Sequence, residues 1–237
     1  MFPKRGCEKP NREDFPMELT GLALQGRTVI EIHSRKDHDR KGDTKMNVNK
    51  QEIEQLITSM LNQNRLEPEQ IPELDLYIDQ ILMLFEDKLG ENRRREKDKI
   101  LTKSMVNNYS KEKLIRPMRG KKYNREQILQ ILMICSLKNI LSIGDIKQVM
   151  TTLMDEGIQA QELEHILEHN RVNRQKLKEG VGDIIEKLEG SYAPEMDTTE
   201  MVSLLLGLAS ISSYCKRTSE EIIDRFFVQD DNEKPVR

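Results

Sequence analysis

A short polar segment near the middle of the chain carries side chains that can read DNA bases. Residues 103–109 include Lys103, Asn107 and Asn108. An asparagine amide can pair with N6 and N7 of adenine in the major groove, and a lysine can donate to guanine. On a short helix these residues suit base recognition. The alternative is that the two asparagines cap a helix or simply face solvent.

A basic segment follows, and its side chains suit contacts with phosphates. Four cations surround Gly120: Arg116, Arg119, Lys121 and Lys122. Such cations position a protein on the nucleic-acid backbone without reading sequence. Two tyrosines flank the segment and can either support it or donate to a phosphate: Tyr109 and Tyr123. Tyr109 is equally suited to a core position.

The charge of the chain is concentrated around these two segments. Residues 91–125 hold thirteen Lys or Arg and four Asp or Glu, whereas the whole chain has a net charge of −3. A block of net charge +9 inside an acidic protein indicates one surface for an anionic partner. The alternative is a solvated loop, and it applies equally to the arginine triplet at residues 93–95.

Helices are expected to position these residues. Leu, Ile, Met, Glu, Lys and Gln dominate the composition, with 4% aromatic residues and no Trp. Periodicity and capping residues predict a mainly α fold with helices at residues 50–63, 73–89, 103–110, 125–139, 143–156, 161–178, 183–188, 201–216 and 220–228. Thr102, Asn124 and Ser142 are the predicted N-caps of three of them. A tight basic hairpin or loop, the wing, is expected at residues 119–123.

The first 45 residues differ from the rest. They show no sustained helical period, and the codons of residues 41–43 can form the string AAA-GGA-GAT, which looks like a bacterial ribosome-binding site just before Met46. We therefore expect a disordered tail or a mis-assigned start at residues 1–45. A helical DNA-binding domain is expected at 46–155, and a helical region serving dimerisation or an effector at 156–237.

Other classes of protein receive little support. No apolar run reaches the roughly 20 residues needed to span a bilayer, so a cytoplasmic protein is expected. The three cysteines, Cys7, Cys135 and Cys215, match neither a disulfide framework nor a zinc pattern. His165, Glu168 and His169 have metal-ligand spacing, but they lie in a solvated Glu- and Gln-rich stretch. No metal, cofactor or enzymatic activity is expected, since nucleotide-binding and nucleophile motifs are also missing.

The order of these segments resembles a known type of DNA-binding domain. The chain is similar to the mercury-resistance-regulator (MerR) family in the order of five elements. These are the recognition helix at residues 105–109, the turn at 114–117, the wing at 120–123 and the following two helices at 128–137 and 142–150. The link at residues 90–101 is longer than the usual tight turn. Over residues 72–150 the chain also resembles the bacterial domain-of-unknown-function family 1836. The resemblance implies a winged helix-turn-helix that binds double-stranded DNA as a homodimer.

The sequence thus favours a transcriptional regulator whose recognition helix, residues 103–109, enters the major groove while the wing contacts phosphates. The alternative is a non-catalytic helical interaction module whose basic block binds an acidic partner or RNA.

Overall fold

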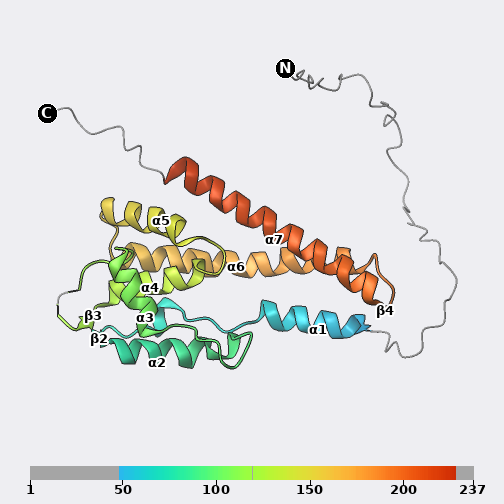
Figure 1. Ribbon diagram of the computed structural model, residues 1–237, viewed down its shortest axis with the longest axis horizontal. Helices are drawn as coiled ribbons and strands as arrows, with labels where there is room; N and C mark the ends of the chain where they lie inside the picture. Colours follow the sequence, from blue (N-terminus) through green and yellow to red (C-terminus); the bar gives the residue numbers. More distant parts are fainter. Residues whose placement is uncertain (1–47, 119, 228–237) are drawn as a thin grey trace, which may run out of the picture. The chain divides into compact units, whose positions relative to one another are not determined.

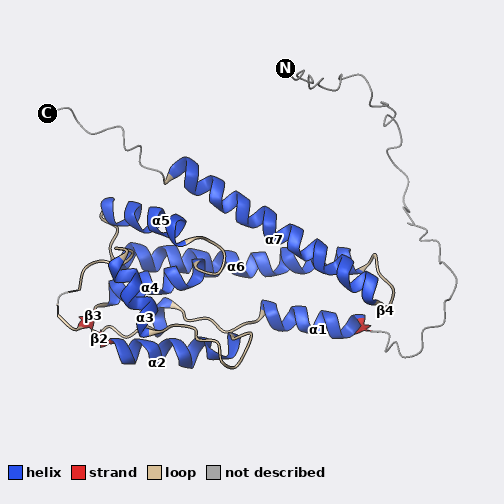
Figure 2. Ribbon diagram, in the orientation of Figure 1, coloured by secondary structure: helices blue, strands red, loops and turns tan. Residues whose placement is uncertain are grey.

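The computed structural model describes residues 48–118 and 120–227, all of which lie within one compact unit. The described part is mainly helical, as predicted, with seven α-helices, two short 3₁₀ helices and four two-residue strands (Figures 1 and 2). In chain order these are β1 (Val48–Asn49), α1 (Lys50–Leu61), η1 (Pro68–Gln70), β2 (Leu76–Tyr77), α2 (Ile78–Leu89), η2 (Gly90–Asn92), α3 (Lys103–Lys111), β3 (Lys122–Tyr123), α4 (Arg125–Leu137), α5 (Ile143–Asp155), α6 (Ala160–Glu189), β4 (Glu195–Met196) and α7 (Thr198–Phe226). The predictions for residues 1–45 and for Arg119 fall outside the described residues.

Three helices begin at the residues that the capping signals predict. The Thr102 hydroxyl accepts from the Met105 amide at 3.2 Å, and the Asn124 side chain accepts from the Gln127 amide at 3.0 Å. Ser142 accepts from the third residue of α5 at 3.1 Å in the same way. These side-chain oxygens satisfy amide groups that have no partner inside the first turn of a helix. The predicted N-caps of α3, α4 and α5 are therefore confirmed.

The predicted helix at residues 73–89 is wrong at its beginning. α2 starts at Ile78, and the two residues before it form β2. β2 pairs antiparallel with β3, so that Leu76 faces Tyr123 and Tyr77 faces Lys122. The Gln80 side chain also accepts from the Tyr77 amide at 2.9 Å, which closes the first turn of the helix. Pairing with the distant strand β3 holds this segment extended despite its apolar pattern.

Two helices are longer than predicted. α6 runs without a break through Gly180 and Gly182, where a break was expected. Each glycine costs a helix about 1 kcal/mol relative to alanine, and buried Ile185 packs the turn that follows. α7 likewise continues through Thr218 and Ser219. Their hydroxyls donate to carbonyls one turn back, at 2.9 and 3.0 Å, instead of capping a new helix.

Two apolar cores hold these elements together. The larger core collects side chains from α2, α3, α4, α5, the start of α6 and the end of α7: Phe85, Val106, Ile128, Ile146, Leu163 and Ile223. The smaller core joins Ile53 of α1, Met196 of β4 and Leu204 of α7, beside the antiparallel pairing of β1 with β4. The division of the chain at residue 155 remains a prediction, although α6 and α7 contribute to the core around α4. Among the described residues, no helix is long and apolar enough to cross a membrane.

Candidate nucleic-acid interface

The α3 helix turns one polar face to solvent. Val106 and Tyr109 are buried in the larger core, whereas Lys103, Asn107 and Asn108 are exposed. The helical period places the three polar residues on the side away from the core. Ser104 and Lys111 are also exposed, and Lys111 extends this face by one turn. Sequence reasoning did not single out Lys111, although it lies four residues after Asn107, which is the spacing of neighbours on a helix.

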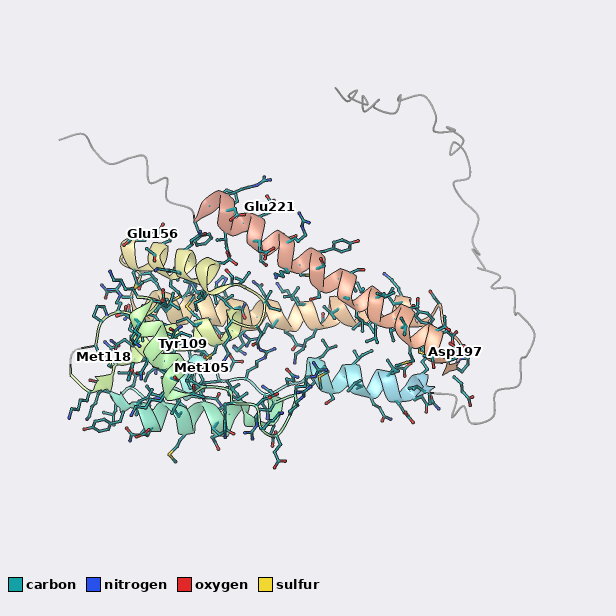
Figure 3. All side chains as sticks on the ribbon, in the orientation of Figure 1. Met105, Tyr109, Met118, Glu156, Asp197 and Glu221 are labelled. Carbon is teal, nitrogen blue, oxygen red and sulfur yellow. The ribbon has the colours of Figure 1, made fainter. Side chains whose placement is uncertain are left out.

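Tyr109 belongs to the core that supports this face. Its side chain is 5% exposed, and Figure 3 shows it on α3. Burial raises the pKa of the Tyr109 hydroxyl to about 12, with a smaller contribution from the nearby Cys135 thiol. The same burial raises the pKa of Cys135 to about 11. Both groups stay protonated near neutral pH, and Tyr109 offers almost no surface to a nucleic acid.

The wing is attached to both helices that precede it. Lys122 pairs with Tyr77 in the β2–β3 ladder, and its Nζ lies 5.0 Å from the centre of the Tyr77 ring, a cation–π distance. Tyr123 is buried in the larger core together with Val106 and Tyr109 of α3. Gly120 has a φ of +93°, a left-handed conformation that favours glycine. Lys121 and Lys122 are exposed, while Arg119 lies outside the described residues.

Two buried glutamines of α4 hold the chain where it enters the wing. The Gln130 side chain accepts from the Arg116 amide at 2.9 Å, and the Gln127 side chain donates to the Arg116 carbonyl at 3.0 Å. Gln130 is 1% exposed and Gln127 4%. Side chains of α4 thereby satisfy both the backbone amide and the backbone carbonyl of Arg116. The sequence signal was available as two glutamines three residues apart within an apolar helix, but sequence reasoning did not use it.

The Arg116 side chain is engaged inside the protein. Its guanidinium forms an ion pair with Glu126 at 2.5 Å and donates to the Ile158 carbonyl at 2.8 Å. Arg125, the last cation of the basic block, similarly pairs with Glu164 at 2.5 Å and donates to the Pro68 carbonyl at 3.0 Å. These two arginines join α4 to its neighbours. The exposed positive charge of the site therefore comes from lysines of α3 and the wing.

The long link between α2 and α3 is tied to the body at three points. Asn92 accepts from the Asn64 amide at 3.1 Å and donates to the Asn64 carbonyl at 2.6 Å. Arg93 pairs with Glu86 of α2 at 2.7 Å. Lys138 donates to the Ile100 carbonyl at 2.5 Å. The other two residues of the arginine triplet, Arg94 and Arg95, are exposed.

The histidine pair on α6 does not gather further ligands. The rings of His165 and His169 lie 4.4 Å apart, centre to centre. Glu168 instead pairs with Arg171, and the hydrogen bond from Arg171 lowers the pKa of the Glu168 carboxyl. Across residues 48–118 and 120–227, no three His, Cys, Asp or Glu side chains are grouped so that they could hold a metal ion.

A comparison with known families covers this part of the molecule. Residues 66–170 match the family described as "Domain of unknown function (DUF1836)". The match is to a DUF1836 domain that covers less than half of the chain. This domain includes the α3 face, the wing and the glutamines that hold it, and the resemblance to family 1836 at residues 72–150 is thereby confirmed. Comparisons with curated proteins and with solved structures found no match for the chain.

Proposed function

We propose that this protein is a sequence-specific DNA-binding regulator, with α3 in the major groove and the wing on phosphates. One observation carries the proposal: the exposed face of α3 and the basic wing are fixed to each other. Tyr123 of the wing is buried in the same core as Tyr109 of α3, and the Leu114 amide donates to the Tyr109 carbonyl at 2.8 Å. A recognition helix needs a rigidly attached element that contacts the DNA backbone, because such contacts fix the register of the helix on the duplex.

The order of elements supports this proposal. The elements follow in the order β2, α2, α3, β3. β2 directly precedes α2 and pairs with β3, the strand that ends the wing. That order fits the MerR-like winged helix-turn-helix that the sequence resembles. The link between α2 and α3 remains longer than a tight turn, but its hydrogen bonds to Asn64 and Lys138 hold it in place.

Burial divides the residues that the sequence predicts to contact DNA into two groups. The exposed ones are the proposed contacts: Lys103, Asn107 and Asn108 with bases, and Lys121 and Lys122 with phosphates, with Lys111 added beside them. The others support the surface from within: Tyr109, Arg116 and Tyr123. Arg119 stays a proposed contact on sequence grounds alone.

The proposed regulator acts as a homodimer in the bacterial cytoplasm. A dimer places two recognition helices on half-sites about 34 Å apart, one turn of DNA. Exposed apolar side chains on α7 offer a surface for a second copy: Val202, Leu205, Leu206 and Tyr214 are between 49% and 70% exposed. In a dimer with C2 symmetry, α7 of one protomer would pack against α7 of its partner.

The alternative is that the basic block binds RNA or an acidic protein. It is favoured by exposed cations of the link that lie outside α3 and the wing: Arg94, Arg95, Lys97 and Lys99. Selection from random pools separates the two functions. The full-length protein is incubated with a random duplex DNA pool and, in parallel, with a random RNA pool. Enrichment of a two-fold symmetric DNA motif supports the regulator, whereas enrichment from the RNA pool alone, or from neither, contradicts it.

A further inference from the structure

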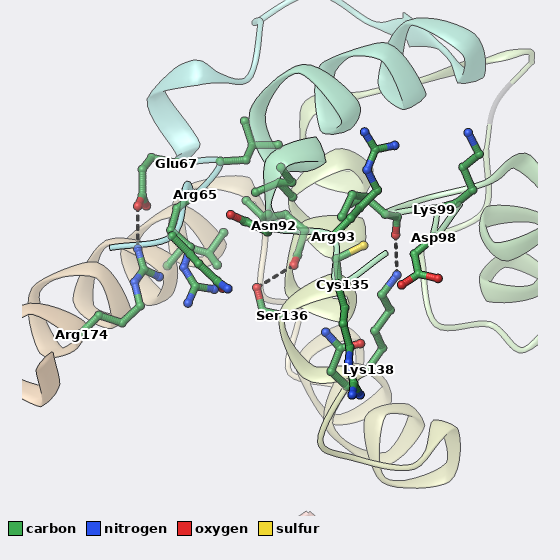
Figure 4. A pocket seen from close by; sticks show the side chains of 18 of the residues that line it. Arg65, Glu67, Asn92, Arg93, Asp98, Lys99, Cys135, Ser136, Lys138 and Arg174 are labelled. Atoms are coloured by element: carbon green, nitrogen blue, oxygen red, sulfur yellow. Dashed lines mark hydrogen bonds and ion pairs between the residues drawn. The ribbon is translucent and has the colours of Figure 1, made fainter. Parts of the chain in front are cut away.

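A cavity of about 360 Å³ lies beside the α2–α3 link, with its other walls formed by the 63–68 segment, α4 and α6 (Figure 4). Its floor is apolar and includes Leu66, Leu132, Leu167 and Cys135. Leu66 and Leu132 belong to the larger core, and Leu167 packs against it. The volume is within the range of about 300–1,000 Å³ typical of small-molecule sites. The cavity can therefore hold a compact ligand with an apolar body.

The rim of the cavity has an excess of positive charge. It is lined by six cations and two acids: Arg65, Arg93, Arg94, Lys99, Lys138 and Arg174 against Glu67 and Asp98. One acid is already engaged, since Glu67 pairs with Arg174 at 2.6 Å. Arg93 is neutralised by Glu86 of α2 at 2.7 Å. In the described part of the chain, no carboxylate lies within ion-pair distance of Arg65, Arg94 or Lys99.

Arg65 is held close to another arginine. Figure 4 shows its side chain beside that of Arg174, whose guanidinium is bound to Glu67. Burial and then repulsion by Arg174 lower the pKa of Arg65, and the attraction of Glu67 opposes this only in part. Two neighbouring guanidinium groups over an apolar floor attract an anion, because an anion between them relieves their repulsion.

We propose that this cavity binds a small organic acid, with its acidic head at Arg65 among the rim cations, beside Arg174, and its apolar body on the leucine floor. A carboxylate or phosphate head matches the planar guanidinium donors. An organic cation would meet the net positive rim, and a bare inorganic anion would leave the floor exposed. The site goes beyond DNA binding and does not depend on it.

The cavity also has a place in the architecture of the DUF1836 domain. Asn92, Arg94 and Lys99 of its lining belong to the link that joins α2 to α3. A bound acid would bridge this link to α4 and α6. Occupancy of the cavity is thereby expected to stabilise the described fold, since a ligand that binds only the folded state raises its stability.

Isothermal titration calorimetry on the full-length protein tests the proposal, using octanoate, phenylacetate and hexyl phosphate as acids. Two controls are matched to the acids. Octylammonium keeps the apolar body but reverses the charge, and inorganic phosphate keeps the negative charge but has no apolar body. We expect saturable binding of at least one acid at one site per chain, with a raised thermal midpoint, and at least tenfold weaker binding of both controls. Saturable binding by none of the acids, or equal binding of octylammonium and octanoate, overturns the proposal.

Two variants locate the site. Arg65→Gln combined with Arg94→Gln is expected to weaken acid binding about tenfold or more, because charge-assisted hydrogen bonds are lost. Arg217→Gln removes an exposed arginine of α7 and is expected to leave binding unchanged. Thermal midpoints without ligand show that both variants fold. Undiminished binding by the folded double variant would place the acid elsewhere and refute the assignment.

Discussion

Gln130 of α4 accepts the hydrogen bond of the Arg116 amide at 2.9 Å, at a position that is 1% exposed. With Gln127 bound to the Arg116 carbonyl at 3.0 Å, this contact fixes where the wing leaves the core. The polar surface of the wing therefore depends on a buried contact. A substitution at this buried contact can therefore displace the proposed phosphate-binding lysines without altering the lysines themselves.

Gln130→Leu should destabilise the protein. The substitution leaves the Arg116 amide buried without an acceptor, which costs about 1–3 kcal/mol. Urea unfolding followed by circular dichroism measures the change in the free energy of unfolding. Gln161→Leu, the same substitution at an exposed position of α6, is the control and should change it by less than about 0.5 kcal/mol. Equal losses in the two variants would show that the buried contact contributes nothing.

Asn107→Ala should change which DNA is bound. Asn107 is exposed on α3, so its loss should leave the free energy of unfolding almost unchanged. Loss of a bidentate contact with adenine should weaken binding by about 1–3 kcal/mol and relax the preference at one base pair. Binding is measured on the selected motif and on duplexes altered at each position. A uniform loss across all these duplexes would exclude Asn107 as a base contact.

Lys121→Ala combined with Lys122→Ala should weaken binding to every duplex by a similar factor. If each lysine neutralises one phosphate, the slope of log K against log salt should fall by about 2 in magnitude. Tyr77→Leu removes the ring beneath Lys122 but keeps both charges, so it is expected to preserve the slope. Lys121 and Lys122 do not contact phosphates if the lysine variant keeps the wild-type slope or loses affinity at one sequence only.

Tyr109→Phe should make the protein less sensitive to alkaline pH. Burial raises the pKa of Tyr109 to about 12, above its value of about 10 in the unfolded chain. The folded state therefore holds this proton more tightly. The contribution of Tyr109 to stability is fully present below pH 10 and is lost as the pH rises through 12.

The measurement compares wild type and Tyr109→Phe by urea unfolding at pH 8 and at pH 11. The difference in stability between the two proteins should move in favour of the variant at the higher pH. Because both proteins share every other titrating group, the comparison isolates Tyr109. An unchanged difference would indicate that the Tyr109 hydroxyl is hydrated in the folded protein.

Local signals in the sequence predicted the helices of the site well. The N-caps Thr102, Asn124 and Ser142 act within three residues of their partners, so their chemistry is visible in the sequence. The apolar pattern of α3 and α4 was similarly local. Gly180 and Gly182 misled because their effect depends on packing farther along α6, which a residue-by-residue reading does not include.

Contacts between distant segments could not be predicted in this way. The pairing of Leu76 with Tyr123 joins segments 47 residues apart and converts the expected start of a helix into a strand. The burial of Tyr109 depends on where α4 packs, and the ion pair of Arg116 with Glu126 depends on the path of the wing. Charge counts alone treated every Lys and Arg of the basic block alike, whereas the structure uses some of them internally.

If α3 and the wing form one surface for specific DNA, the full-length protein should bind duplex DNA from upstream of its own gene, and fluorescence anisotropy measures this binding. Titrations are made between 50 and 200 mM salt, with and without excess random duplex. We expect tight binding that weakens steeply with salt, as phosphate contacts require, and that survives the competitor. Binding that is lost to the competitor at every salt concentration, or no binding at low salt, would contradict it.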